Sequence, residues 1–280
     1  GNFTSAVTIT APVAQIAATL SDPNGWSYTP PSNFAGNTVN PRYEILTVSA
    51  SDGGATGSGG VKSDMRRVTL YVSEVNDAPL ITVPTVPAVV DEDLVLNLSS
   101  LGNIEITDAD AGNAVVSVQL SVSRGTITVD TAVAGGPQIA GNGTSVVGLS
   151  GTLAAINHLL DSFVNYQSLL NVNTTHGPEV LTILANDLGN SGGPAASSVA
   201  RITITVNPVN DAPQISLPGT APSVAEDTDL RIPAISISDP DVTEAGADGV
   251  ITVTLSVTPI APNTRAGTLT VNPAVVPGLT

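Results

Sequence analysis

The chain has 280 residues, enough for one large domain or two to three small ones, and its 24 acidic and 8 basic residues give a formal net charge of −16. This balance argues against nucleic acid and anionic membranes as partners, since both are bound mainly through Lys and Arg, and it suits cation binding. Cysteine is absent and strand-forming residues are interrupted by Gly and Pro, so the composition predicts an all-β fold without disulfides.

In chain order, the hydrophobic pattern predicts strands with period-two alternation and two short segments with helical spacing. Helical spacing covers Pro12–Leu20 and Thr152–Asp161, and the first residue of the second segment is a suitable N-cap. Alternation is clearest over Val115–Val122, Ile202–Val206 and Ile251–Val257. We therefore expect immunoglobulin-like β-sandwich repeats in tandem, each with one short helix crossing between its two sheets.

An internal repeat organises the chain. The pentapeptide Val-Asn-Asp-Ala-Pro occurs at Val75–Pro79 and again at Val209–Pro213, a spacing of 134 residues, and the segments that flank the two copies also match. We therefore expect a complete repeat over residues 76–209. It would be flanked by the C-terminal half of a repeat over residues 1–75 and by the N-terminal half of a further repeat over residues 210–280.

Acidic residues fall where strand direction places them at the two ends of the complete repeat. Because successive strands run in opposite directions, one end is expected to gather Asn76, Asp77, Asp108, Asp110 and Asp187. The opposite end is expected to gather Glu92, Asn210 and Asp211, facing Asp239 and Asp241 of the following half-repeat. Comparison of the repeats adds Asp52, the counterpart of Asp187, and Glu226, the counterpart of Glu92.

Crowded carboxylates repel one another unless a cation lies among them. Ca²⁺ takes about six to eight oxygen ligands, whereas Mg²⁺ keeps more of its water, so Ca²⁺ is the expected ion and Mg²⁺ the second choice. Each motif alone has another interpretation: Asn-Asp-Ala-Pro forms turns readily, and Asp108-Ala109-Asp110 would suit a solvated loop. Their combination at each end favours calcium, and all the residues of the two ends are candidate ligands.

These motifs resemble the cadherin-like tandem repeats of large bacterial surface adhesins, including those with RTX segments. Three motifs occur here in the same order along the chain as in the family: an Asn-Asp linker, a Glu near the end of the first strand, and an Asp-x-Asp pair. The family's Ala-x-Asp-x-Gly motif matches Ala50–Gly54 and Ala185–Gly189. The Asp-Arg-Glu motif of animal cadherins is missing, and segments near Tyr28 and Tyr166 replace it. The resemblance implies calcium at the junctions between repeats, with fewer ions at each junction than in animal cadherins.

The resemblance also implies a structural role outside the cell. Calcium-rigidified repeats would extend an adhesive region from a bacterial surface, in a fibre or biofilm, toward a cell-surface or matrix target. Neighbouring repeats, or copies of the chain, would contact one another head to tail, and the two half-repeats of successive copies could complete each other. The alternative is a glycan- or protein-binding module, for which Trp26–Phe34 is the main candidate segment. No insertion into a membrane is expected.

Catalysis is not expected. His158 and His176 lie 18 residues apart without a paired acid, and there is neither a thiol nor a Gly-x-Ser-x-Gly motif. In Gly57–Ser63 a valine separates the last glycine from the lysine, which breaks the P-loop pattern.

Two residue pairs at equivalent positions of the repeat carry further predictions. Glu44 and Glu179 precede late strands and are expected to face solvent. Tyr28 and Tyr166 are expected to pack in the core rather than to stack on a ligand.

Overall fold

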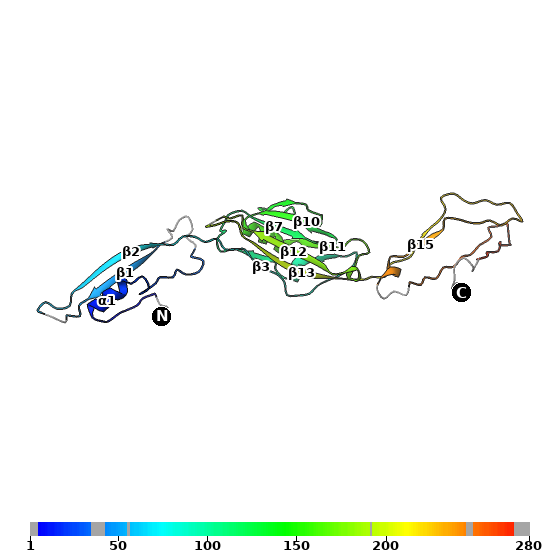
Figure 1. The fold of residues 1–280 in the computed structure, drawn as a ribbon. Coiled ribbons are helices and arrows are strands. Elements are labelled where there is room, and N and C mark those ends of the chain that lie inside the picture. Colours follow the sequence, from blue (N-terminus) through cyan, green and yellow to red (C-terminus); the bar gives the residue numbers. More distant parts are fainter. Residues whose placement is uncertain (1–4, 35–42, 55–56, 191, 245–248, 272–280) are drawn as a thin grey trace.

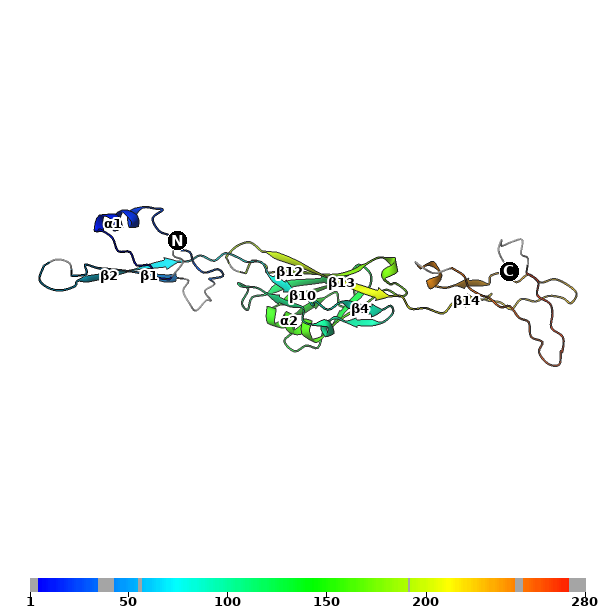
Figure 2. The ribbon, with the colours of Figure 1, turned by 90° about the horizontal axis from the view of Figure 1, so that it is seen from below.

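The computed structural model describes residues 5–34, 43–54, 57–190, 192–244 and 249–271. Three bodies follow one another along the chain (Figure 1): a helix with a β-hairpin, a β-sandwich, and an extended C-terminal segment. The sandwich lies between the other two bodies in the perpendicular view as well (Figure 2). Within the described residues, no helix combines the length and the apolar content needed to cross a membrane.

Two sheets form the sandwich. The larger sheet has the order β4-β13-β12-β7-β10-β9, in which β4 and β13 are parallel and all other neighbours antiparallel. Its strands are β4 (Ala88–Asp91), β7 (Val116–Ser121), β9 (Gln138–Ala140), β10 (Val146–Gly151), β12 (Glu179–Asn186) and β13 (Ser197–Asn207). The smaller sheet has the order β5-β11-β8, with β5 (Val95–Asn97), β8 (Thr126–Val129) and β11 (Val164–Gln167). A separate antiparallel pair joins β3 (Leu80–Thr82) and β6 (Glu105–Thr107).

A short helix carries the chain from one sheet to the other. Helix α2 (Leu153–Ser162) follows β10 of the larger sheet and precedes β11 of the smaller one. The Thr152 side chain caps it by accepting a 3.3 Å hydrogen bond from the Ala155 amide. Two single-turn 3₁₀ helices, η1 (Leu98–Leu101) and η2 (Thr174–His176), complete this repeat. The prediction of an all-β sandwich with a short crossover helix is confirmed.

The core lies between the two sheets and draws on both halves of the repeat. Burial alternates along β7, where Val116, Val118 and Leu120 point inward. They meet buried residues of later strands, such as Leu181 on β12. Full burial of one such aliphatic side chain stabilises the fold by about 1.5–3 kcal/mol. The strand predicted over Val115–Val122 is therefore confirmed.

Tyr166 packs in this core, as predicted. Its side chain is buried, and its hydroxyl donates a 2.8 Å hydrogen bond to the Arg124 carbonyl. Burial, which comes first, and the nearby Glu179 carboxylate raise the pKa of Tyr166 well above its usual value. Tyr28 differs, because it is 39% exposed and donates a 2.6 Å hydrogen bond to Glu44 Oε2. That hydrogen bond is the main cause of a raised Tyr28 pKa.

The prediction that Glu179 faces solvent is wrong. Its side chain is only 3% exposed, and it accepts hydrogen bonds from the amides of Ser123 at 2.8 Å and Arg124 at 2.9 Å. These two residues form the turn between β7 and β8. Glu179 opens β12 on the inward side of the pleat, and the turn amides compensate the burial of its charge. Its counterpart Glu44 is half-buried in the N-terminal body.

The two flanking bodies contain fewer elements. The N-terminal body has α1 (Val13–Ser21), of which no residue is buried, and a hairpin of β1 (Tyr43–Ser51) and β2 (Ser63–Tyr71). Among its described residues, the C-terminal body has one antiparallel pair, β14 (Gln214–Ser216) with β15 (Ser236–Ser238), and the 3₁₀ helix η3 (Asp241–Thr243).

The strand predicted over Ile251–Val257 is not formed. These residues have no regular secondary structure. Their pattern matches β7, a strand that is paired on both sides in the sandwich, by β10 and β12. A strand needs such neighbours to satisfy its backbone N–H and C=O groups. The correct alternating pattern was therefore not sufficient for a strand in this part of the chain.

Candidate metal centre

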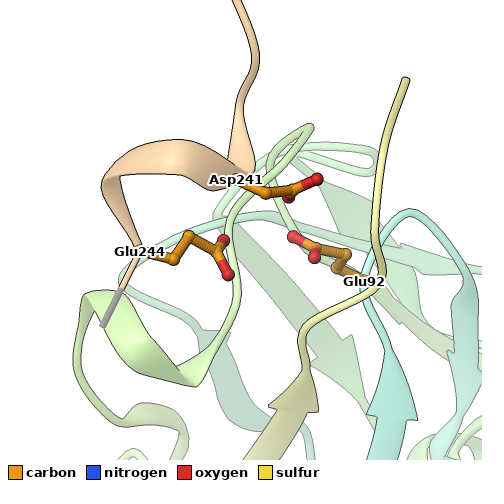
Figure 3. Close-up of side chains that lie close together, drawn as sticks. All are labelled: Glu92, Asp241 and Glu244. Carbon is orange, nitrogen blue, oxygen red and sulfur yellow. The ribbon is translucent and has the colours of Figure 1, made fainter. Parts of the chain in front are cut away.

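Three acidic side chains converge at the C-terminal end of the sandwich (Figure 3): Glu92, Asp241 and Glu244. One carboxylate oxygen from each lies within 4.8 Å of the others. Glu92 directly follows β4 and is only 2% exposed, whereas Asp241 opens η3 and Glu244 follows it. Within the described part of the chain, no other three acidic or histidine side chains meet this closely. A sandwich residue and two residues of the next body thus share one site.

Glu92 is held in place by donors from two directions. The Val209 amide, in the linker, donates a 2.6 Å hydrogen bond to Glu92 Oε1. The buried Asn173 side chain places its amide nitrogen 3.1 Å from both Glu92 oxygens and also contacts Glu244 Oε1. Asn173 is oriented by Thr175, whose backbone N–H donates to Asn173 Oδ1 at 2.9 Å. The carboxylates are therefore positioned by groups outside the acidic set.

The linker ties the C-terminal body to this site. The Asp211 amide donates a 2.5 Å hydrogen bond to Asp241 Oδ2, and the Asp241 amide donates one of 2.9 Å to Asp239 Oδ1. The Oδ2 atom of Asp211 is buried and has no hydrogen-bond partner. The pKa of Asp211 is raised, first by burial and then by the negative charges of Asp241, Asp93, Glu92 and Asp239. This concentration of like charge is unfavourable unless a positive charge enters the site.

We call these residues the second acidic cluster: Glu92, Asn210, Asp211, Asp239, Asp241 and Glu244. The side chain of Asn210 donates a 3.1 Å hydrogen bond to the Asp211 carbonyl.

A similar arrangement occupies the N-terminal end of the sandwich, and we call it the first acidic cluster: Asn76, Asp77, Asp108, Asp110 and Asp187. The Asp77 amide donates a 2.6 Å hydrogen bond to Asp110 Oδ2, and the Asp110 amide donates one of 2.8 Å to Asp108 Oδ1. Asn76 donates a 2.6 Å hydrogen bond from its side chain to Asp187 Oδ2. Both Asn76 Oδ1 and Asp108 Oδ2 are buried without a partner.

Asp187 is the most buried residue of the first acidic cluster, at 1% exposure. Burial is the largest influence on its pKa and acts to raise it, but hydrogen bonds from the Gly189 and Ala196 amides and from Asn76 outweigh burial. The pKa of Asp187 is therefore lowered, and the charged form is favoured. The cluster presents a carboxylate that is already ionised and oriented.

The remaining two predicted ligands lie outside both clusters. Asp52 is exposed in the N-terminal hairpin, where hydrogen bonds from the Lys62 and Gly54 amides, both 2.9 Å, lower its pKa. These bonds repeat those that Ala196 and Gly189 make to Asp187. Glu226 is exposed in the C-terminal body.

The donor set fits a hard cation. Every candidate ligand offers carboxylate, amide or backbone oxygen, which is the ligand chemistry of Ca²⁺. Among the described residues, five buried side-chain oxygens have no hydrogen-bond partner; three of them, on Asn76, Asp108 and Asp211, lie in the two clusters and are the observation that an oxygen-seeking ion would explain, whereas those of Asn165 and Ser168 lie outside the clusters. Ca²⁺ fits better than Mg²⁺ because many protein oxygens are available at each end.

Asn173 and Glu244 were missed from the sequence. Glu244 corresponds to Asn113 when the Asp-x-Asp pairs of the two repeats are aligned, so comparison of the repeats gave no acidic signal. Asn173 comes from the loop before β12, which carries no acidic motif, and it reaches Glu92 only because the fold brings η2 beside the end of β4.

No family model and no curated protein matches the chain. Among solved structures, the chain is similar to mouse cadherin-23 EC22-24, with 21% identity and a TM-score of 0.30, over 71% of this chain and 54% of that one. It is similar to the protocadherin gammaB7 EC3-6 cis-dimer structure, with 19% identity and a TM-score of 0.31, over 74% and 45%. The chain thus spans about half the length of these cadherin chains.

A cohesin module from a Clostridium perfringens family 33 glycoside hydrolase is also similar, with 16% identity and a TM-score of 0.28. The match covers 49% of this chain and 100% of that module.

Proposed function

We propose that this chain is a structural segment of an extracellular adhesin, in which Ca²⁺ at the junctions between β-sandwich repeats fixes the angle between neighbours. One observation carries the proposal: the same linker arrangement occurs at both ends of the sandwich. A linker aspartate donates its amide to the second residue of an Asp-x-Asp pair, as Asp77 does to Asp110 and Asp211 to Asp241. Unpartnered carboxylate or amide oxygens lie beside each pair.

The physical role of the ion follows from the charges. At the second acidic cluster, Glu92 belongs to the sandwich, Asp211 to the linker, and Asp241 and Glu244 to the next body. A Ca²⁺ ion bound to all of them would join the three parts and cancel their repulsion. Without it, the like charges of the three parts would repel one another across the junction.

The adhesive role is the broader part of the proposal. Repeats joined end to end give an extended chain of modules, which suits a spacer between a cell surface and a distant binding region. The proposal assigns the chain no catalytic step. Its direct partners are neighbouring repeats, and a bacterial surface and a biofilm setting follow from the sequence resemblance.

Calcium titration tests this proposal. We expect isothermal calorimetry to detect calcium binding, and scanning calorimetry to give a higher Tm in calcium than in EDTA. A site at a calcium concentration about 100-fold above Kd adds about 2.7 kcal/mol to the free energy of unfolding. Small-angle scattering should give a narrower distribution of sizes with calcium than without. Identical melting and scattering in calcium and EDTA would reject the proposal, and Mg²⁺ serves as the matched comparison ion.

The rival function is glycan binding through the segment around Trp26. Trp26 is 48% exposed, and its indole N–H donates a 3.3 Å hydrogen bond to the Leu20 carbonyl. In the alignment of the repeats, Trp26 corresponds to Val164, which is fully buried in β11. This correspondence favours a packing role for Trp26. Glycan-array binding that is lost on Trp26→Ala would support the rival function instead.

A further inference from the structure

Two of the four tyrosines of the chain meet on one side of the N-terminal hairpin. Tyr43 is the first residue of β1 and lies directly opposite Tyr71, the last residue of β2. Their ring centroids are 6.0 Å apart in an edge-to-face arrangement, and the residues are 38% and 82% exposed. An exposed aromatic pair in a chain with 3% aromatic residues marks a candidate interaction surface.

This side of the hairpin faces away from the interior of the repeat. Glu44, on the other side of β1, corresponds to Glu179, which is buried in the sandwich. Side chains alternate between the two sides of a strand, so both tyrosines lie on the outward side. Their counterparts in the complete sandwich, Pro178 and Thr205, are exposed. The outward side is therefore exposed in a complete repeat as well.

The aromatic pair is not needed to form the hairpin. β12 and β13 pair in the same register with a proline and a threonine at the two tyrosine positions. The rest of the outward side consists of exposed residues, most of them with hydroxyl groups: Ile45, Thr47, Ser49, Ser51, Ser63, Met65, Arg67 and Thr69. The two acidic residues of these strands, Glu44 and Asp64, lie on the interior side. The outward side of the two strands thus carries one positive charge and no negative charge.

Arg67 supplies that positive charge and differs from its neighbour Arg66. Arg66 lies on the interior side, where its Nε atom is 3.1 Å from Asp64 Oδ2. Arg67 lies opposite Thr47, and its side chain forms no hydrogen bond or ion pair with the described residues. Its guanidinium donors are therefore available to an external acceptor.

The chemistry of the outward side fits an acidic carbohydrate. The C–H groups of a sugar ring pack against tyrosine rings, and hydroxyl side chains such as Thr69 both donate and accept hydrogen bonds with sugar hydroxyls. A guanidinium binds a carboxylate or a sulfate through two parallel N–H donors. Tyr71 and Arg67 are four residues apart on β2, about 13 Å along the strand, so the ligand spans more than one sugar ring.

A protein partner fits this surface less well. Protein interfaces bury a contiguous apolar centre. On the outward side, the aliphatic residues Ile45 and Met65 are separated by the row that Thr47 and Arg67 form. Hydroxyl groups and a guanidinium therefore interrupt the apolar surface, which suits a ligand that is itself rich in hydroxyl groups.

We propose that the outward side of the β1–β2 hairpin binds an acidic oligosaccharide. One sugar ring packs against Tyr43 and Tyr71, and the acidic group of a neighbouring sugar pairs with Arg67. The site differs from the Trp26–Phe34 segment, in which Tyr28 bonds to Glu44 on the interior side of β1.

The net charge of the chain does not prevent this binding. A charge of −16 opposes an anionic ligand, but charges more than about 8 Å away are largely screened at physiological ionic strength. Arg67 is the charge of the two strands that faces the ligand, so the local interaction is attractive. Binding at this site does not require calcium, and it would give the segment an adhesive surface of its own.

A glycan array tests the proposal with the full chain in EDTA. The array carries oligosaccharides with uronic acid, sialic acid or sulfate groups beside their neutral parents. We expect the acidic oligosaccharides to bind at least about tenfold more tightly than their parents, because only they pair with Arg67. Arg67→Gln should remove that difference. Tyr71→Ala should weaken binding of the acidic oligosaccharides by at least about tenfold, whereas Tyr71→Phe, which keeps the ring, should stay within about threefold.

Two arginine variants are the matched controls. Arg66→Gln removes the neighbouring charge on the interior side, and Arg201→Gln removes the counterpart of Arg67 from a surface without tyrosines. Both should leave binding within about twofold, since an exposed charge away from the ligand contributes little. Arg67→Gln leaves the tyrosine pair intact, so it tests the site even if Tyr71→Ala opens the hairpin.

Three results would overturn the proposal: no acidic oligosaccharide binds, Arg66→Gln reduces binding as much as Arg67→Gln, or Tyr71→Ala leaves binding unchanged. Retention on immobilised poly-L-glutamate without binding on the array would assign the surface to an acidic polypeptide and would overturn it as well. Loss of binding with Trp26→Ala but not with Tyr71→Ala would assign glycan binding to the Trp26 segment instead.

Discussion

The backbone N–H of Asp211 donates a 2.5 Å hydrogen bond to the Oδ2 atom of Asp241. The same bond joins Asp77 to Asp110 at 2.6 Å at the other end of the sandwich. In both cases the linker peptide is fixed to a loop of the repeat that follows it. The accepting carboxylate uses one oxygen for this hydrogen bond, and its second oxygen takes no part in it. One backbone arrangement thus prepares both junctions, and the two clusters should respond in parallel to changes in their acidic residues.

Glu92→Gln should weaken calcium binding at the second acidic cluster. The amide can still accept the Val209 hydrogen bond, so the variant keeps the local fold and loses one negative ligand. We expect the affinity of this site to fall about tenfold, which corresponds to about 1.4 kcal/mol. Isothermal calorimetry measures it. Asp161→Asn, an exposed residue at the end of α2, is the control for the change in net charge. Equal losses in both variants would mean that Glu92 is not a ligand.

Asn173→Asp should make the second acidic cluster more dependent on a cation. The Asn173 amide group faces Glu92 and Glu244, so an added carboxylate would bring a third negative charge against them. We expect the Tm in EDTA to fall by several degrees, equivalent to about 1–2 kcal/mol, and calcium to restore most of the loss. Asn103→Asp, at an exposed position, provides the control. A loss that calcium does not reverse would assign Asn173 a purely structural role.

Sequence patterns predicted the sandwich and its helix because both depend on local signals. Alternation along Val115–Val122 and the capping residue Thr152 needed no knowledge of distant contacts. The grouping of Asp108 and Asp110 with Asp77 also followed, from strand direction alone.

The predictions that failed depend on contacts between segments far apart in the sequence. Glu179 is buried because a turn more than fifty residues away supplies its donors. Glu244 enters the acidic site only through the path of the linker. The Ile251–Val257 segment has the pattern of a strand, but no strand among the described residues pairs with it. No local pattern reports such partners.

Glu179→Ala should destabilise the central sandwich strongly. The variant leaves the Ser123 and Arg124 amides of the β7–β8 turn without their acceptor. A hydrogen bond to a charged group contributes about 1.5–3 kcal/mol, so we expect a loss of about 3 kcal/mol from the two bonds after partial solvation of the turn. Urea unfolding followed by circular dichroism measures it. Glu179→Gln should lose less stability than Glu179→Ala. The control Glu105→Ala, at an exposed position of β6, should change the free energy of unfolding by under about 0.5 kcal/mol.

Trypsin should separate the central sandwich from the flanking bodies. Of the possible cleavage sites, Lys62, Arg66 and Arg67 lie in the isolated hairpin, and Arg231 and Arg265 lie outside regular secondary structure. An isolated two-stranded hairpin is only marginally stable, so opening for cleavage costs little there.

Arg124 and Arg201 are the trypsin sites within the sandwich, and both should resist cleavage. Arg124 donates from its guanidinium to the Gly177 carbonyl, and Arg201 lies within β13, paired with Thr182 of β12. Dilute protein should therefore yield a resistant fragment of residues 68–231, identified by mass spectrometry. Cleavage at Arg124 or Arg201 at the rate of Arg231 would contradict a separately stable sandwich.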